Sequence, residues 1–172
     1  MPVTRLNHAV LYVRDAERSA AFYEEVLGFS RLSMGGGLRG AVFMRAPGST
    51  NDHDLGLFSI GAGAGPSAAG RQTVGLYHLA WEVDTLEELE RLAGALAARG
   101  ALVGASDHGT TKALYGKDPD GLEFEVSWLV PAELITEEAL AARSTIRPLD
   151  IAKEKERYGA TTRGGVGVSV VG

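Results

Sequence analysis

The chain of 172 residues contains no cysteine. Disulfides, thiolate metal ligands and a cysteine nucleophile are therefore excluded, and a bound metal would have to use histidine, aspartate or glutamate. Apolar stretches stay well short of the roughly 18 residues that a membrane-spanning helix needs. The first residues also lack the charged start, apolar run and small-residue cleavage site of a secretory signal, so we expect a cytoplasmic protein.

Clustered positive charge is missing as well. The net charge is −5, and no basic run exceeds a couple of residues. A general nucleic-acid binder needs a positive surface, so neither nucleic acid nor a membrane is an expected partner. The chain is 45% apolar and 23% charged, which is ordinary for a soluble globular protein. Its length suffices for one domain with a proper core or for two small fused modules.

The same order of expected strands and helices occurs twice along the chain. Residues 6–13, "LNHAVLYV", read as a strand, and residues 76–83, "LYHLAWEV", read as another with its histidine at the same third position. A helix follows each strand, and three short strand-like segments follow each helix. The first helix is predicted to start at Asp15 and end at Gly28. The second is predicted to start with a capping box of Asp84 and Glu87 and to end at Gly100.

Apolar spacing predicts which face each helix buries. The expected core positions are Ser19, Phe22, Tyr23 and Val26 in the first helix and Leu86, Leu89, Ala93 and Leu96 in the second. A half of this size cannot bury both faces of its sheet, so the two halves should pack together. We therefore predict an α+β fold of two tandem βαβββ modules in a curved mixed sheet. The expected divisions are residues 1–60, a linker 61–75, residues 76–130, and 131–172 as a C-terminal helix with a Gly/Val-rich tail, all in one structural domain.

Two glutamates share one face of the last predicted strand. Strand alternation places Glu123 and Glu125 on the same side. If that side is buried, each carboxylate needs water, a basic group or a metal, because an unpaired buried charge is costly. His8 and His78 hold matching positions in the two modules, and a pseudo-twofold arrangement would bring them together. Two imidazoles and one carboxylate form the facial set that holds non-haem Fe(II); spacing alone leaves both glutamates open as the third ligand, and an arginine partner or a solvated face open as alternatives to a metal.

The segment "DHGTTKALYGKDPDGLEFE", residues 107–125, resembles the vicinal oxygen chelate superfamily, which includes glyoxalases, bleomycin resistance proteins and dioxygenases. Within it the likeness is to single-chain extradiol dioxygenases of the catechol 2,3-dioxygenase type. Their signature is an Asp-His pair, a hydrophobic-Tyr step, a D-P-[DES]-G turn and a metal-binding Glu four residues after the glycine. The openings "LNHAVLYVRDAERSAAFYEEVLGF" and "GLYHLAWEV" resemble the starts of the two family modules, so the likeness covers about residues 4–130.

The resemblance implies a role for every histidine of the chain. It implies a metal-centred cleft with ligands His8, His78 and Glu125, catalytic or substrate-binding roles for His53, His108 and Tyr115, and an outer or structural role for Glu123. Fe(II) is the expected metal, with Mn(II) or another divalent ion as the alternative. The implied reaction is ring cleavage of a catechol-like aromatic diol with O2, a step in the breakdown of aromatic compounds. Independently of the resemblance, we expect a homodimer, because homodimers are the commonest assembly and the segment after residue 131 could form the contact. His53 follows Asp52 where the family often has a second histidine, and both His53 and His108 could instead be surface residues.

Two other activities occur on the same scaffold. A glyoxalase-like isomerase or lyase usually takes four protein ligands, one from the last strand of each module, and uses the metal as a Lewis acid. Residues 55–60, "LGLFSI", contain no Glu, Gln or His, and Asp54 is the nearest substitute. This vacancy favours three ligands. A small-molecule-binding resistance protein is the other alternative, but such members typically lose the ligand set.

Overall fold

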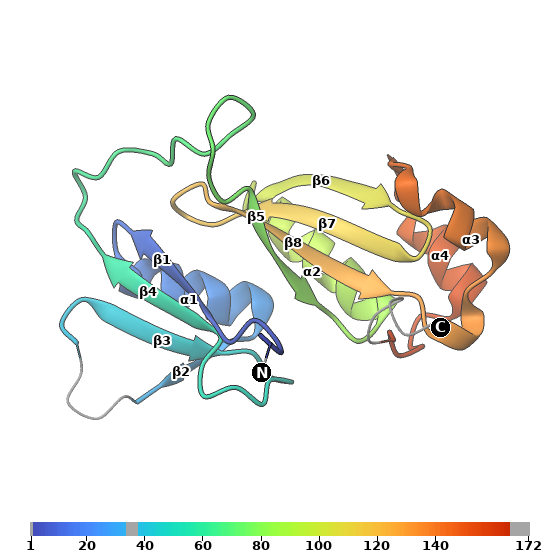
Figure 1. The fold of residues 1–172 in the computed structure, drawn as a ribbon, viewed down its shortest axis with the longest axis horizontal. Coiled ribbons are helices and arrows are strands. Elements are labelled where there is room, and N and C mark those ends of the chain that lie inside the picture. The colour runs from blue at the N-terminus through green and yellow to red at the C-terminus, as the bar shows by residue number, and fades with distance from the viewer. Residues whose placement is uncertain (1, 34–37, 166–172) are drawn as a thin grey trace. The chain divides into compact units, whose positions relative to one another are not determined.

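The computed structural model describes residues 2–33 and 38–165 and divides the chain into two compact units (Figure 1). Unit 1 comprises Met1–Ser67 and Asp118–Gly121, and unit 2 comprises Ala68–Lys117 and Leu122–Gly172. Each unit is an α+β structure with its own mixed sheet, which confirms the predicted fold class. None of the described helices is both long enough and apolar enough to cross a membrane.

Unit 1 has the predicted βαβββ order. Its elements are β1 (Ala9–Val13), α1 (Ala16–Leu27), β2 (Ser30–Leu32), β3 (Ala41–Arg45) and β4 (Leu55–Ser59). The sheet order is β1-β4-β3-β2, with β1 parallel to β4 and the other pairs antiparallel. The first helix begins and ends as the sequence predicts, because Asp15 accepts hydrogen bonds from the backbone N–H groups of Glu17 and Arg18 and Gly28 adopts a φ of 72°. The four predicted core positions of α1 are buried.

The turn at residues 118–121 belongs to unit 1 and not to the module whose strands it joins. Arg14 donates to the carboxylate of Asp120 from its backbone N–H (2.7 Å) and from its guanidinium (2.8 Å). Gly121 has a φ of 84°, which favours glycine at that position. The tight turn at residues 118–121 is therefore bound to the residue that precedes the N-cap of α1.

Unit 2 repeats the same order and adds a fifth strand. Its module contains β5 (His78–Glu82), α2 (Leu86–Ala98), β6 (Leu102–Asp107), β7 (Thr111–Lys117) and β8 (Glu123–Leu129), and the sheet order is β5-β8-β7-β6-β9. The predicted capping box at Asp84 is wrong by one residue. Thr85 is the N-cap and accepts from the backbone N–H of Glu88, because Thr85 is the last residue with extended backbone. Leu92, and not Ala93, completes the buried face of α2.

The C-terminal segment is more complex than the single helix predicted within residues 131–172. It forms η1 (Ala132–Leu134), α3 (Glu137–Ala141), η2 (Ala142–Ser144), β9 (Arg147–Pro148) and α4 (Ile151–Tyr158). The predicted helix is interrupted because Thr136 has extended backbone and caps α3 through the Ala139 N–H. Figure 1 shows α3 and α4 together at one end of the second sheet. Residues 166–172, in the predicted Gly/Val-rich tail, lie outside the described residues.

A buried lysine fastens this segment to the sheet. Lys112 on β7 is 1% exposed, and its ammonium donates to Asp107 Oδ1 at 2.5 Å. It also pairs with Glu154 Oε2 of α4 at 2.9 Å. Arg147 of β9 pairs with the other Asp107 oxygen at 2.9 Å. Charged side chains from β6, β7, β9 and α4 therefore form one cluster, the Lys112 cluster.

Candidate metal centre and its surroundings

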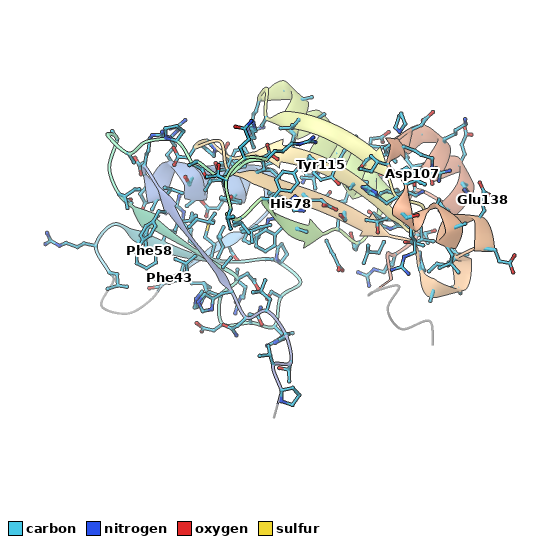
Figure 2. The ribbon with its side chains drawn as sticks, turned by 45° about the horizontal axis from the view of Figure 1, so that its top comes forward. Phe43, Phe58, His78, Asp107, Tyr115 and Glu138 are labelled. Atoms are coloured by element: carbon cyan, nitrogen blue, oxygen red, sulfur yellow. The ribbon has the colours of Figure 1, made fainter. Side chains whose placement is uncertain are left out.

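Unit 2 carries a row of polar side chains on one face of its sheet. The parallel pairing of β5 with β8 sets Ala80 opposite Glu125, and the antiparallel pairing of β7 with β8 sets Tyr115 opposite Glu125. His78, two residues before Ala80, shares this face. Its Nε2 lies 3.2 Å from Glu125 Oε2, and its ring centroid lies 5.9 Å from that of Tyr115. Figure 2 shows His78 and Tyr115 beside each other on the sheet.

The spacing of His78 and Glu125 fits a shared metal ion. Two ligands held about 2.1 Å from a metal at a right angle lie about 3.0 Å apart, close to the separation seen here. The Nδ1 atom of His78 is buried and has no hydrogen-bond partner among the described residues. A buried nitrogen without a partner costs free energy, so a hydrogen bond of Nδ1 does not account for the position of this ring.

The two glutamates of β8 have different surroundings. Glu125 Oε1 accepts from the Ser127 hydroxyl at 2.5 Å, which leaves Oε2 facing His78. Glu123 lies 3.5 Å from the ammonium of Lys117 in a partly exposed ion pair. Geometry thus favours Glu125 over Glu123 as a ligand beside His78, and the assignment of Glu125 to a metal stays a prediction.

His108 lies next to Tyr115 in a second group of hydrogen bonds. Its Nε2 is 2.8 Å from the Ser106 hydroxyl and 3.2 Å from the Tyr115 hydroxyl, and its Nδ1 is 3.0 Å from the backbone oxygen of Thr145. Burial raises the pKa of the Tyr115 hydroxyl, the hydrogen bond with Ser106 opposes that rise, and the charge of Glu125 adds to it. The net pKa is raised, so Tyr115 is a protonated donor at neutral pH.

Sequence reasoning missed Ser106 and Thr145. Ser106 stands two residues before His108, and strand alternation was the signal that could have placed both on one face. Thr145 had no such signal, because its role depends on a backbone oxygen brought in by a distant segment.

Unit 1 carries the other two histidines, and they touch. The ring centroids of His8 and His53 are 4.4 Å apart. His8 stands immediately before β1, with Nδ1 2.7 Å from Asn7 Oδ1. His53 precedes β4, and its Nδ1 lies 3.0 Å from an Asp52 oxygen. The ring of Phe43 meets His53 edge-on at 5.1 Å.

The strand register of unit 1 identifies the counterpart of Glu125. In unit 2, Glu125 lies opposite the residue two after His78; in unit 1, the residue two after His8 is Val10, and Gly56 lies opposite it. The position that would supply a fourth protein ligand is therefore glycine. Asp54 is no substitute, since its carboxylate already accepts from the Ala46 N–H (2.8 Å), the Ser49 hydroxyl (2.7 Å) and the Asn51 amide (2.7 Å).

The predicted ligands are divided between the units. His8 lies in unit 1, whereas His78 and Glu125 lie in unit 2. Within the described ranges, the structure shows no group of three or more His, Asp or Glu side chains that could hold a metal ion. The union of His8 with the His78–Glu125 pair stays a prediction.

Comparisons with known proteins place the chain in a family. The model of the Glyoxalase/Bleomycin resistance protein/Dioxygenase superfamily matches residues 5–126. A catechol-2,3-dioxygenase from Bacillus subtilis (strain 168) is 32% identical over 126 residues, which is 72% of this chain and 41% of that protein. The chain thus spans less than half the length of that relative.

Solved structures agree on the fold. A glyoxalase/bleomycin resistance protein/dioxygenase domain from Frankia sp. EAN1pec gives a TM-score of 0.60 at 25% identity, over 73% of this chain and 92% of that chain. The fosfomycin resistance protein FosX from Listeria monocytogenes, in a variant complexed with Mn(II) and a dihydroxypropylphosphonic acid, gives 0.53 at 20% identity, over 73% and 90%. Since the family model covers most of its length and the repeated βαβββ order agrees, the chain belongs to the glyoxalase/bleomycin resistance protein/dioxygenase superfamily.

Proposed function

We propose that this protein is a metal-dependent extradiol dioxygenase that opens the ring of a catechol-like aromatic diol with O2. The observation that carries the proposal is the His78–Glu125 pair, 3.2 Å apart, with the Tyr115 hydroxyl beside it on the same sheet face. The relationship to a catechol-2,3-dioxygenase supports the choice of reaction.

His8, His78 and Glu125 would hold the metal, with Fe(II) preferred over Mn(II) or another divalent ion. When bound, such a metal would supply charge stabilisation and electron relay for the diol and O2. Gly56 in the fourth-ligand position supports this set over the four-ligand set of a glyoxalase-like isomerase.

The remaining site residues would handle protons and hold the diol. His53 would take a proton from a diol hydroxyl as a general base and later return it as a general acid. Tyr115, kept protonated by its raised pKa, would donate a hydrogen bond to an oxygen of the ligand. The Nε2 atom of His108 lies 3.2 Å from the Tyr115 hydroxyl, and it would bind the ligand close to the same oxygen.

The test is oxygen uptake by protein loaded with Fe(II) under anaerobic conditions, after addition of catechol and simple substituted catechols. Glu125→Gln and Glu123→Gln form a matched pair on the same strand and face. We expect Glu125→Gln to lower metal affinity and oxygen uptake by at least about 100-fold, and Glu123→Gln to keep both near wild type. His78→Ala should behave as Glu125→Gln does.

Three outcomes are informative. Uptake with a coloured ring-opened product, lost in Glu125→Gln alone of the matched pair, supports the proposal. Stoichiometric metal without uptake would contradict ring cleavage and point to a Lewis-acid isomerase or lyase. Failure to bind any divalent metal would contradict the ligand set and leave a small-molecule-binding protein.

A further inference from the structure

The C-terminal segment reaches a proposed site residue although it lies outside the family match. The family model ends at residue 126, whereas Thr145 stands between η2 and β9. The backbone oxygen of Thr145 lies 3.0 Å from His108 Nδ1. A part of the chain that the family model does not cover therefore contacts the imidazole that the site uses.

This contact fixes which nitrogen of His108 carries the proton. A carbonyl oxygen only accepts hydrogen bonds, so Nδ1 must donate and must be protonated. In the neutral ring Nε2 then holds the lone pair. The hydroxyls of Ser106 and Tyr115 face Nε2 at 2.8 and 3.2 Å. Ser106 donates its one proton to the Tyr115 hydroxyl at 3.4 Å, and the Tyr115 hydroxyl can donate to the Nε2 lone pair. In the opposite tautomer the Nδ1 lone pair would face the carbonyl oxygen, and one hydroxyl would lose its acceptor.

We propose that the Thr145 carbonyl is a positioning group for His108: it holds the imidazole in the Nδ1–H form, so that Nε2 is the atom that accepts a proton or hydrogen bond from the substrate. The C-terminal segment then contributes to the site by orienting His108. The Nδ1–H form of His108 follows from the hydrogen-bond geometry, whereas the role of Nε2 toward the substrate rests on the proposed function.

The chain is shaped for this close approach. Gly109, next to His108, has a φ of 74°, and a Cβ there would lie 2.2 Å from the Ala139 oxygen and 2.9 Å from the Ala142 Cβ. Only glycine lets α3 and η2 lie this close to the His108 loop. Thr145 is held in turn by the Ala142 oxygen, which accepts from the Thr145 N–H (2.9 Å) and hydroxyl (2.7 Å).

The first measurement is the tautomer of His108 in the metal-free full-length protein. Long-range ¹H–¹⁵N spectra of protein labelled in histidine distinguish the protonated ring nitrogen from the bare one. The chain has only 4 histidines, and a His108→Gln variant identifies the signal. We expect the Nδ1–H form in wild type. A dominant Nε2–H form would overturn the proposal.

Variants then test the cause. Gly109→Ala should push the segment off the loop and give a mixture of tautomers. Gly100→Ala is the matched control, because Gly100 also has a positive φ, of 64°, but a Cβ there meets nothing within 4 Å. Thr145→Val, which loses the hydroxyl, should also give a mixture, whereas Thr145→Ser should keep the wild-type spectrum. Unchanged spectra in both Gly109→Ala and Thr145→Val would refute the positioning role.

Turnover separates this inference from the proposed function. If wild type cleaves catechols, Gly109→Ala and Thr145→Val should lower kcat by about tenfold with KM changed less than about twofold, as expected for partial loss of a proton-handling group. A changed tautomer with unchanged kcat would overturn the substrate part. An Nδ1–H signal in a protein that cleaves no catechol would sustain the tautomer and contradict the proposed function only.

Discussion

Replacing Lys112 by methionine should destabilise the protein strongly. The Lys112 ammonium is the shared cation of the Lys112 cluster, 2.5 Å from Asp107 and 2.9 Å from Glu154. Its side chain is 1% exposed, so water does not screen these pairs. Methionine has a similar length and keeps the apolar contacts of the stem, but it leaves the two carboxylates without their common partner.

The size of the loss follows from that burial. Removing one member of a buried ion pair costs about 3–5 kcal/mol, because the remaining charge is left uncompensated. Arg147 and the Gly109 N–H still bind Asp107, so the uncompensated charge is mainly that of Glu154 and the loss should lie near the lower end, about 3 kcal/mol. With a urea dependence of about 2 kcal/mol/M, the unfolding midpoint should fall by about 1.5 M.

Urea titration followed by circular dichroism measures this loss. Lys153→Met is the control, since Lys153 is an exposed lysine on the same α4 helix that supplies Glu154, and its free energy of unfolding should stay within about 0.5 kcal/mol of wild type. The double variant Lys112→Met with Glu154→Leu should recover part of the loss, because the carboxylate that faced the Lys112 ammonium is then removed together with its partner. A loss below about 1 kcal/mol in Lys112→Met would refute the reasoning.

Three further outcomes are expected. Burial raises the pKa of Asp107, but hydrogen bonds from Lys112 and Gly109 and the nearby Arg147 outweigh it and hold that pKa below its usual value. The contribution of ionised Asp107 to the free energy of unfolding should therefore be present above about pH 4 and be lost as the pH falls further. Urea titrations from pH 7 to 3 measure this loss. Asp54→Asn should cost about 1–3 kcal/mol in unit 1 by the same assay, because an amide nitrogen cannot accept the bonds that this carboxylate accepts, while exposed Asp52→Asn should cost little. If the proposed function holds, Gly56→Glu should keep bound metal but lower oxygen uptake at least about tenfold by adding a fourth protein ligand, whereas Gly56→Leu, a bulk control, should lower it less.

Local patterns in the sequence predicted what local physics decides. The ends of α1 at Asp15 and Gly28 were predicted because capping and a positive φ depend on only a few neighbouring residues. The repeated strand–helix–three strands order was predicted from the periodicity of apolar residues. The start of α2 was missed by one residue, since Asp84 and Thr85 are both good N-caps and only backbone conformation separates them.

Long-range pairing explains what was not predicted. Lys112 reads as an ordinary polar residue of a strand, and its burial depends on Glu154 from a segment distant in sequence. The sequence did not predict α4, because a charged segment of eight residues with few regularly spaced apolar side chains is a weak helix on its own. Tertiary contacts stabilise it: Glu154 pairs with Lys112, and the ring of Tyr158 packs on that of Trp128 with centroids 5.5 Å apart.

The two copies of the module have diverged at matching positions of their sheets. Register equates Gly56 with Glu125, and Phe43, opposite Gly56, with Tyr115, opposite Glu125. Unit 1 therefore has Phe43 and Gly56 where unit 2 has Tyr115 and Glu125, so it lacks both the hydroxyl and the carboxylate at these positions. The rings of Phe43 and Phe58 meet edge-on with centroids 5.8 Å apart, and Figure 2 shows the two side chains beside each other. The matching positions of the two modules thus supply one carboxylate and not two, which under the proposed function favours the three-ligand set and is the reason to test catechols first.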